Sequence, residues 1–307
     1  MFVKEYDEFH IKDRLYIYWD ITTKCNYNCD YCYARHHYKN EWQKEISFNK
    51  QLLILKSLSL SPLPLYLGFQ GGEPLLNSRF FDLLDETLKL KNLDNIYIAT
   101  NGSCDNSIFR KFEKYKNNKK LRVMLSYHCT QCKNTERFIK NVEILNSFGI
   151  KTKVNVLLVQ DNKYYNKIKY VFETCSKITK VHPHFIYDCV NEDEIIRGYS
   201  EDFFKQFDFI KQSQCYYVFE EENGVKKRFT DYDVFKNKFY NFKDWKCYMN
   251  NYEIFLNVDF HKLCTDKVIN VLEDPLYFKR IKSVEPIICK ETHCYSDGVL
   301  KCLKTKY

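Results

Sequence analysis

Three cysteines near the start of the chain have a spacing that suits an iron–sulfur cluster. Cys25, Cys29 and Cys32 form a CxxxCxxC pattern within a single short segment. Three thiolates at this spacing can bind three irons of a 4Fe–4S cube. No fourth cysteine lies close in sequence, so the fourth iron stays open to a substrate or cofactor. A zinc site would normally use four ligands in paired CxxC spacings, so the pattern favours a cluster with an open iron.

A second motif, Gly71-Gly72-Glu73-Pro74, follows further along the chain. It comes directly after an apolar run at 63–69 that predicts a strand, and a helical pattern opens soon after it. Glycines at the C-terminal end of a strand let the backbone approach a ligand closely. Glu73 adds an acceptor for a cationic group, so this turn is a second candidate binding segment.

The CxxxCxxC loop followed by the GGEP segment resembles the radical S-adenosylmethionine (radical SAM) superfamily. The resemblance implies that SAM chelates the open iron and that the segment Gly71–Pro74 holds the amino group of SAM. It also implies that one electron from the reduced cluster breaks the sulfur–C5′ bond, and that the resulting 5′-deoxyadenosyl radical abstracts hydrogen from a substrate. Tyr31 is expected to line the SAM site against adenine, or to pack as an aromatic that fixes the loop.

Short strands alternate with helical patterns along most of the chain. We predict strands at 14–22, 63–69, 95–100, 121–126, 154–159 and 180–187. This alternation indicates an α/β fold with a parallel sheet and right-handed crossovers. Six units agree with the partial (β/α)6, TIM-like barrel of radical SAM enzymes. Pro183 weakens the last strand or places it at a sheet edge.

The motif residues fall at the C-terminal ends of these strands, where barrels of this kind carry out their chemistry. The cysteine loop follows the first strand and the GGEP turn follows the second. Asn101 and Ser126 end the third and fourth strands. By the resemblance, polar groups at these two ends contact the ribose of SAM, which makes Asn101 and Ser126 the candidates. A turn asparagine and a strand-end serine are also ordinary structural residues.

Five more cysteines lie in the C-terminal part of the chain, which also contains a predicted hairpin at 252–263 with its turn near 259–261. This layout resembles the twitch domain, a shorter relative of SPASM that holds an auxiliary Fe–S cluster. The resemblance makes these cysteines candidate ligands of a second 4Fe–4S cluster, and Cys302 could replace Cys294. Buried free thiols or a zinc site are the alternatives. The candidates are Cys247, Cys264, Cys289, Cys294 and Cys302.

Cys129 and Cys132 form a CxxC pair just beyond the fourth predicted strand. Cys129 is our candidate catalytic residue, because a thiol near the barrel mouth could bind metal or donate a hydrogen atom to a substrate radical. An incidental pair of loop cysteines is the alternative.

The length of 307 residues suggests about two domains. We expect the radical SAM barrel at 1–190 and a C-terminal, Cys-rich auxiliary domain with a hairpin and a helix at 246–307. A connecting region at 191–245 is expected to cover the open side of the barrel. Within it, 215–229 predicts a hairpin that turns at Asn223-Gly224.

The composition indicates the cellular compartment and the kinds of partner that we expect. The 48 Lys and Arg residues exceed the 40 Asp and Glu residues, which gives a formal charge of +8. A solvated surface explains this modest excess, so we expect no nucleic-acid partner. No apolar run of about 18 residues and no cleavable signal is visible, so we expect a cytoplasmic protein without a membrane partner. Thiols in that compartment are kept reduced, so the 14 cysteines indicate metal ligands rather than disulfides.

These observations lead to an expected function. We expect a radical SAM oxidoreductase that modifies or crosslinks a peptide by oxidation and takes electrons from a reductant such as a flavodoxin or ferredoxin. One alternative is a dehydrogenase or epimerase that acts on a carbohydrate or nucleotide. Another is a non-catalytic Fe–S or zinc-binding protein. The preference for a peptide depends on family-level analogy alone.

Overall fold

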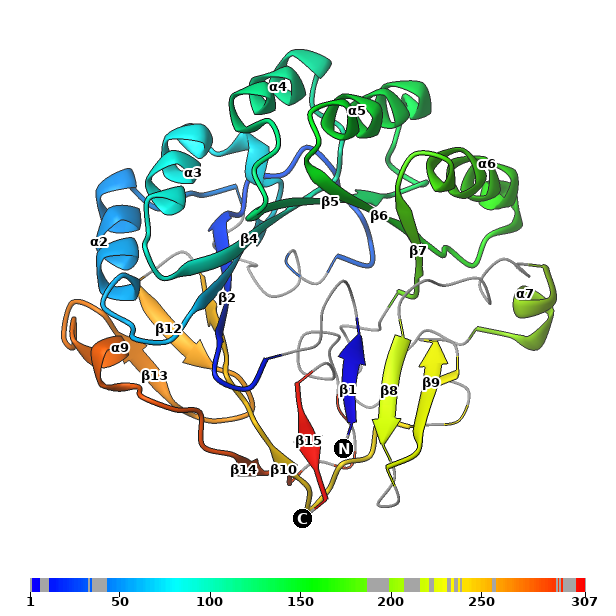
Figure 1. Cartoon of the computed structure of the whole chain (residues 1–307). Coiled ribbons are helices and arrows are strands. Elements are labelled where there is room, and N and C mark those ends of the chain that lie inside the picture. Colours follow the sequence, from blue (N-terminus) through cyan, green and yellow to red (C-terminus); the bar gives the residue numbers. More distant parts are fainter. Residues whose placement is uncertain are drawn as a thin grey trace.

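The computed structural model describes the following residues: 2–5, 11–32, 34, 43–186, 199–206, 216–220, 224–230, 233–234, 237, 239–255, 258–290, 292, 294 and 302–306. Asn223, at the predicted hairpin turn, lies outside them. Figure 1 shows a curved sheet with an arc of helices around it, and a smaller sheet at the side that the arc leaves open.

A nine-stranded sheet contains six consecutive parallel strands, as predicted, and these strands extend to one of its edges. Helices or helical turns between them cover its outer face (Figure 1). The strands are β2 (Leu15–Thr22), β3 (Leu65–Gly71), β4 (Leu93–Thr100), β5 (Leu121–Tyr127), β6 (Lys151–Leu157) and β7 (Lys180–His184). The helices are α2 (Phe48–Leu58), α3 (Phe80–Leu88), α4 (Asn106–Arg110), α5 (Thr135–Ser147) and α6 (Tyr165–Ser176), with 3-10 turns η1 (Pro74–Leu76), η2 (Lys111–Tyr115) and η3 (Asn162–Tyr164).

Pro183 has the position that its chemistry requires. It lies in β7, the last strand of the nine-stranded sheet, which pairs only with β6 among the described strands. Proline lacks the backbone N–H that a central strand must donate to its neighbours, so an edge strand accommodates it. The sequence prediction of an edge is confirmed.

The two faces of β2 pack against different layers. Trp19 is fully buried and packs edge-to-face against Phe69 of β3, in the large core cluster that includes residues of the outer helices. On alternate positions, Tyr18 packs against Tyr97 of β4. Gly68 allows this, because a Cβ at Gly68 would lie 2.1 Å from the Tyr97 ring. Both faces of β2 are therefore buried, as expected for a strand in a parallel barrel sheet.

The C-terminal hairpin joins the barrel sheet. Strand β11 (Asn251–Ile254) runs parallel to β2, and β12 (Asp259–Lys262) and β13 (Val268–Asn270) follow in antiparallel pairing. The hairpin is confirmed, but its predicted turn is wrong, because 259–261 lies within β12 and the connection comes earlier. The register explains the difference, since Ile254 pairs with Phe260 and Phe260 is fully buried.

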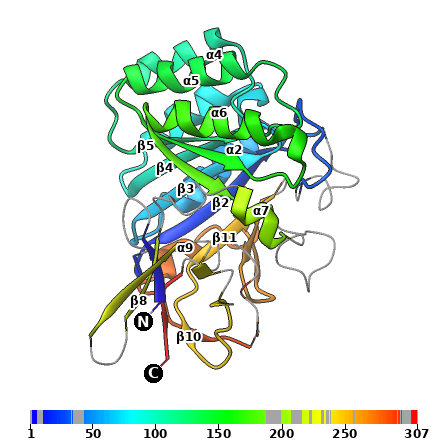
Figure 2. The same ribbon diagram turned by 90° about the vertical axis from the view of Figure 1, so that its right-hand side faces the viewer.

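A six-stranded sheet occupies the open side of the barrel (Figures 1 and 2). Its order is β14-β10-β15-β1-β8-β9. The strands are β1 (Phe2–Glu5), β8 (Tyr216–Glu220), β9 (Lys226–Thr230), β10 (Lys246–Cys247), β14 (Ile287–Ile288) and β15 (Lys304–Thr305); the short helices α7 (Glu201–Gln206) and α9 (Tyr277–Arg280) complete the fold. The pairing of β8 with β9 confirms the predicted hairpin in the connecting region.

The predicted division at 1–190, 191–245 and 246–307 does not coincide with the two sheets. Strand β1 from the N-terminal segment lies between β15 and β8 in the small sheet, while β11 from the C-terminal segment extends the barrel sheet. Backbone groups at sheet edges need partners, and segments distant in sequence supply them here. The two ends of the chain are thereby interlocked.

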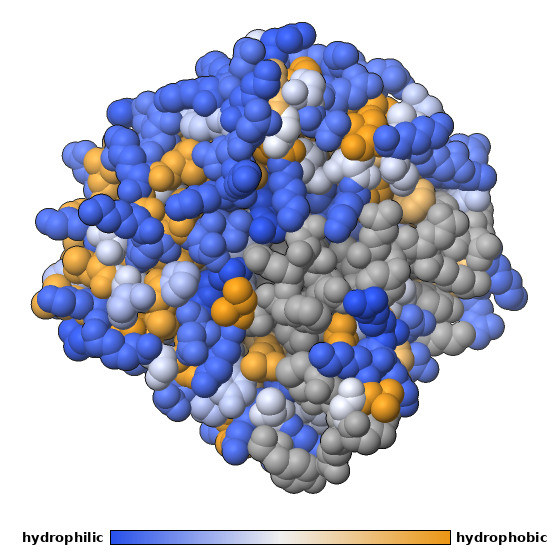
Figure 3. All heavy atoms as spheres, viewed as in Figure 1, coloured by the Kyte–Doolittle hydropathy of each residue, from blue (hydrophilic) through white to orange (hydrophobic). Residues whose placement is uncertain are grey.

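The surface over the helical arc is mostly hydrophilic, with isolated hydrophobic spots (Figure 3). Among the residues described, no helix is long and apolar enough to cross a membrane.

Candidate functional site

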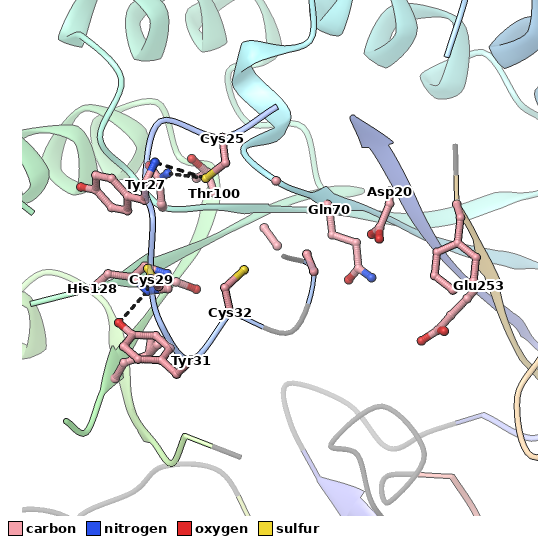
Figure 4. Close-up of a pocket in the computed structure, with 18 residues that line it drawn as sticks. Asp20, Cys25, Tyr27, Cys29, Tyr31, Cys32, Gln70, Thr100, His128 and Glu253 are labelled. Atoms are coloured by element: carbon pink, nitrogen blue, oxygen red, sulfur yellow. Dashed lines mark hydrogen bonds between the residues drawn. The ribbon is translucent and has the colours of Figure 1, made fainter. Parts of the chain in front are cut away.

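A cavity of about 310 Å³ opens at the C-terminal ends of β2 to β5. Figure 4 shows Cys25, Cys29 and Cys32 along one side of it. The predicted site residues that line the cavity are Cys25, Cys29, Tyr31, Cys32, Gly71, Gly72, Asn101 and Ser126. Cysteines from one loop and polar groups from three successive strand ends are therefore brought together, as the sequence predicted.

The two glycines of the GGEP segment hold the start of the cysteine loop. Gly72 N–H donates to the Thr22 carbonyl at 2.9 Å, and Glu73 N–H donates to the Lys24 carbonyl at 2.7 Å. A Cβ at Gly72 would lie 2.3 Å from the Lys24 carbonyl oxygen, and one at Gly71 would lie 2.2 Å from the Thr22 carbonyl oxygen. Only glycine permits this approach of two backbones. The glycines also line the cavity, but their first observed role is to fix the loop.

Glu73 differs from the expectation that its side chain meets a ligand. Its carboxylate is fully buried and is not among the groups that line the cavity. It accepts hydrogen bonds from Thr100 Oγ1 at 2.7 Å and from the backbone N–H groups of Asn101 at 2.7 Å and Leu75 at 3.1 Å. Burial raises the pKa of Glu73 to about 7. The side chain is thus used inside the protein to tie β3 to β4, and Pro74 starts the turn η1 away from the cavity.

Asn101 connects the end of β4 to the cysteine loop. Its Nδ2 donates to Asn26 Oδ1 at 2.9 Å and lies 3.9 Å from Cys25 Sγ. Its Oδ1 accepts the N–H of Ser103 at 2.9 Å, and Ser103 Oγ in turn accepts Asn26 Nδ2 at 2.7 Å. Asn101 therefore positions the loop and Cys25, in addition to lining the cavity. Ser126 is half-buried on β5 and lines the cavity without such a network.

Tyr31 and His128 form a packed pair beneath Cys29 (Figure 4). Their rings stack with an interplanar angle of 7°, and Tyr31 Oη lies 3.1 Å from His128 Nδ1. The same nitrogen lies 3.5 Å from Cys29 Sγ. Burial lowers the pKa of His128 to about 4, so the imidazole is neutral at pH 7. The sequence analysis did not predict His128 as a site residue. Its position directly after the fourth strand of the barrel is the one feature that could have indicated it.

The opposite side of the cavity carries acidic and amide groups that the sequence did not single out (Figure 4). Asp20 comes from β2, Gln70 from β3 and Glu253 from β11. Burial, and then the charge of Asp20, raises the pKa of Glu253 to about 7. Asp20 could have been noticed in the sequence, because it is a charged residue within an otherwise apolar strand. Glu253 reaches the cavity only because β11 pairs with β2, which sequence spacing does not reveal.

The candidate catalytic thiol of Cys129 does not reach the cavity. Cys129 is buried in the main core and does not line the cavity. Burial raises its pKa to about 12, so it stays a protonated thiol. Lys167 Nζ donates to the carbonyl groups of Cys129 at 3.0 Å and Cys132 at 2.6 Å, which fixes this turn against α6. The predicted radical-quenching role therefore lacks the necessary geometry.

The donor set at the cavity fits a cluster with several irons. Among the residues described, no three or more His, Cys, Asp or Glu side chains converge closely enough to hold a single metal ion. The cysteines of a 4Fe–4S cube each bind a different iron, so their sulfurs stand farther apart than the ligands of one ion. Cys25, Cys29 and Cys32 are free thiols that line one shared cavity, so this donor set suits a cluster with several irons.

The five C-terminal cysteines gather at the small sheet. Cys247 ends β10 and forms a side-chain hydrogen bond with Cys302, and both are buried. The pKa of Cys294 is raised to about 11 by burial and responds to the charges of Cys247 and Cys289. Cys264 follows β12 at a left-handed φ of 57° and is exposed. Cys247 and Cys302 therefore pack in one small core cluster, and Cys289 packs against Cys294 in another, although these cysteines come from separate segments.

Comparisons with known proteins bear on the fold and the family of this chain. The chain is 31% identical over 87 residues to molybdenum cofactor biosynthesis protein 1 of Dictyostelium discoideum, a match that covers 28% of this chain and only 14% of that protein. It is similar to the structure of anSMEcpe with bound AdoMet, with a TM-score of 0.54, 16% identity and coverage of 88% of this chain and 78% of that one.

A similar match is to Streptococcus suis SuiB bound to the precursor peptide SuiA, with a TM-score of 0.53, 17% identity and coverage of 87% of this chain and 66% of that one. At such identities the likeness to both structures concerns the fold.

Residues 19–171, about half of the chain, match the family model described as the radical SAM superfamily, and this span carries the cysteine loop and the GGEP segment. The chain belongs to the radical SAM superfamily.

Proposed function

We propose that the protein cleaves SAM reductively at a 4Fe–4S cluster held by Cys25, Cys29 and Cys32, and uses the product to oxidise or crosslink a peptide. The observation that carries the proposal is the meeting of these three thiols with the ends of β3, β4 and β5 in one cavity. When bound, the reduced cluster supplies an electron to SAM, which yields methionine and a 5′-deoxyadenosyl radical that abstracts hydrogen.

The residues of the chain would bind and orient these groups. Gly71 and Gly72 present backbone at the cavity, where the amino group of SAM is proposed to bind. Asn101 and Ser126 are proposed to contact its ribose, and Tyr31 its adenine. The buried network of Glu73, Thr100 and Asn101 would keep the strand ends fixed while SAM binds, because each hydrogen bond is made within the protein.

The peptide substrate is supported by the similar solved structures. SuiB is described as bound to the precursor peptide SuiA, and anSMEcpe as bound to AdoMet and a peptide. A carbohydrate or nucleotide substrate is the second candidate. We further propose that the enzyme works in the cytoplasm with a flavodoxin or ferredoxin as reductant.

An auxiliary 4Fe–4S cluster in the C-terminal part completes the proposal. Cysteines from separate segments pack there in two small core clusters, and Cys247, Cys294 and Cys302 are buried. A second cluster would give the enzyme an electron acceptor for oxidative chemistry, which agrees with the expected class of reaction.

The test of SAM cleavage is formation of 5′-deoxyadenosine by anaerobically reconstituted protein with SAM and dithionite. We expect product with the wild type and none above background with Cys32→Ala. Cys175→Ala is the matched control, because this thiol is fully buried in the main core on α6, away from the cavity. Absence of 5′-deoxyadenosine from wild type that holds its cluster would refute the proposed activity.

The substrate class needs a separate test. Candidate peptides and candidate sugars or nucleotides are incubated with the reconstituted enzyme, and the mass change of each is measured together with 5′-deoxyadenosine. A loss of two mass units from a peptide supports oxidation of the peptide, whereas a change only in a small molecule supports the second candidate.

A further inference from the structure

Two acidic side chains line the cavity on the side opposite the three cysteines (Figure 4). Asp20 lies on β2 and Glu253 on β11. Glu253 stands beside Tyr18 in the parallel pairing of these strands, and Tyr18 and Asp20 are alternate positions of β2, so the two acids share one face of the sheet. The barrel and the C-terminal hairpin thus contribute one carboxylate each, and we call this pair, Asp20 and Glu253, the acidic wall.

The charge of the acidic wall contrasts with that of the whole chain, whose formal charge is +8. Among the described residues that line the cavity, Asp20 and Glu253 are the only carboxylates, and none is a lysine or an arginine. His128, on the cysteine side, is neutral at pH 7 because burial lowers its pKa to about 4. Burial and the charge of Asp20 raise the pKa of Glu253 to about 7, so its carboxyl group ionises in the neutral range. The described lining therefore offers acceptors for a cation.

An aromatic ring and an amide border the acidic wall. Phe255 comes directly after β11 and lines the cavity, and its ring packs against His261 with 5.1 Å between the ring centroids. His261 is not among the residues that line the cavity. Gln70 is the partner of Asp20 in the pairing of β2 with β3, and its Oε1 accepts a hydrogen bond from Tyr97 Oη at 3.0 Å. The ring and the amide are thus held in place by contacts within the protein.

Carboxylates beside an aromatic ring can bind an ammonium or a guanidinium group. The carboxylate oxygens accept charge-assisted hydrogen bonds from such a group. The ring can pack against the methylene stem of a basic side chain or take the cation at its face. An anionic group would be repelled by the same carboxylates. The acidic wall therefore selects for a cation, in the cavity where the reaction is proposed to occur.

We infer that the acidic wall binds a cationic group of the substrate, an ammonium or a guanidinium, and that Glu253 is the residue that sets this specificity. The inference rests on the proposed function and narrows the proposed peptide to one with a lysine or arginine side chain. An amino sugar would present the same ammonium group as a small molecule, whereas nucleotides and sugar phosphates are disfavoured. The cation would lie opposite the cysteines, which leaves their side of the cavity to SAM.

The experiment measures binding rather than turnover. Enzyme reconstituted with its cluster is dialysed with SAM, in the absence of reductant, against an equimolar mixture of probes. The probes are short peptides that differ only in a central lysine, arginine, norleucine or glutamate, together with glucosamine and N-acetylglucosamine, and the retained amount of each is measured by mass spectrometry. We expect the lysine and arginine peptides to bind about tenfold more tightly than the norleucine peptide, which is the effect of one hydrogen bond to a charged group.

Two variants test the role of the charge. Glu253→Gln keeps the size of the side chain but removes its charge, and should reduce the preference to about threefold or less. Glu173→Gln is the matched control, because this glutamate lies on the exposed side of α6 and does not line the cavity. It should keep the full preference. Circular dichroism confirms that each variant is folded.

The preference of the wild type decides the inference. Equal retention of charged and neutral probes, or retention of no probe, would overturn it. Formation of 5′-deoxyadenosine, measured after dithionite is added to the same samples, would in that case still support the proposed SAM cleavage. Enzyme that cleaves no SAM would fail the proposed function, whereas the dialysis decides the charge preference without turnover.

The remaining outcomes identify the source of the cation and the residue that binds it. Retention of glucosamine over N-acetylglucosamine, with no preference among the peptides, would support the cation site and assign it to a small molecule. A preference that persists in Glu253→Gln would overturn the role of Glu253. Loss of SAM itself from this variant would also overturn the inference, because the acidic wall would then belong to the cofactor.

Discussion

The two groups of cysteines are held by the fold in different ways. Cys25, Cys29 and Cys32 belong to one loop, whose start is fixed by backbone hydrogen bonds to the GGEP segment. The C-terminal cysteines come from several segments, and Cys247 and Cys302 meet only because β10 and β15 pair in the small sheet. The first group faces a cavity of about 310 Å³, whereas Cys247 and Cys302 are buried.

The two proposed clusters would have different tasks. A cluster at an open cavity can bind a cofactor at its free iron, so the protein must leave room and orient the ligand. A cluster enclosed by protein would exchange electrons, and the protein would act on it through charge and burial. Polar groups from three strand ends line the cavity at the first group, whereas the buried Lys304 donates to the Cys302 carbonyl at the second.

The largest expected effect separates the two sites by SAM cleavage. Cys29→Ala removes a thiol from the cavity and should reduce 5′-deoxyadenosine formation to the level seen without enzyme. Cys302→Ala removes a fully buried thiol of the small sheet and should leave the rate within about a factor of three, because distant sites act independently. Equal loss of SAM cleavage in both variants would contradict the separation of tasks.

The next effect tests how the cysteine loop is held. Gly72→Ala places a Cβ 2.3 Å from the Lys24 carbonyl oxygen, and backbone cannot move aside without shifting the loop. We expect a loss of about 3 kcal/mol in the free energy of unfolding, measured by urea, together with lower iron content.

Gly224→Ala is the matched control for this variant. Gly224 has a φ of +80°, and a Cβ there meets no atom within 4 Å. Gly224→Ala should therefore lower the free energy of unfolding by only about 1 kcal/mol, because the left-handed backbone is its one source of strain. If the two substitutions cost the same, close packing at Gly72 does not hold the loop.

The parts of the site that depend on local sequence were predictable. CxxxCxxC and GGEP each lie within one segment, and alternating strands and helices bring the ends of β2 and β3 to the same edge of the sheet. The edge position of Pro183 also followed from its missing N–H. What the spacing did not reveal is that Glu73 would turn inward, because its partners Thr100 and Asn101 belong to the next strand.

The parts that depend on long-range pairing were not predictable. Glu253 faces the cavity because β11 adds to β2 in parallel, and β1 enters the small sheet beside β15. Sequence periodicity identifies a strand but does not identify its neighbour. The same limit explains the misplaced hairpin turn and the division at 1–190, 191–245 and 246–307, which the strand order crosses.

A third prediction concerns Glu253, where the C-terminal hairpin meets the barrel cavity. Burial and then the charge of Asp20 raise its pKa from 4.5 to about 7, so the folded state binds this proton more tightly than the unfolded state does. The charged form therefore lowers stability. This cost is absent below about pH 4.5, grows up to about pH 7 and is constant above.

Glu253→Gln removes the cost. We expect its free energy of unfolding to exceed that of the wild type by about 2 kcal/mol at pH 8 and to match it at pH 4. Glu173→Gln, on the exposed side of α6, should change stability by less than about 0.5 kcal/mol at either pH. A gain for Glu253→Gln that is the same at both pH values would show that its charge is not the cause.

The smallest expected effect concerns the support beneath the cysteine loop. Tyr31→Phe removes the hydroxyl that lies 3.1 Å from His128 Nδ1, but keeps the stacked ring. Because His128 is buried, the lost hydrogen bond should cost about 1 kcal/mol in unfolding by urea at pH 7, measured without the cluster. Tyr170→Phe removes a comparable bond to Glu136 from a ring that is 45% exposed, and should cost less than about 0.5 kcal/mol. A Tyr31→Phe variant no weaker than this control would mean that the loop is held from the GGEP side alone.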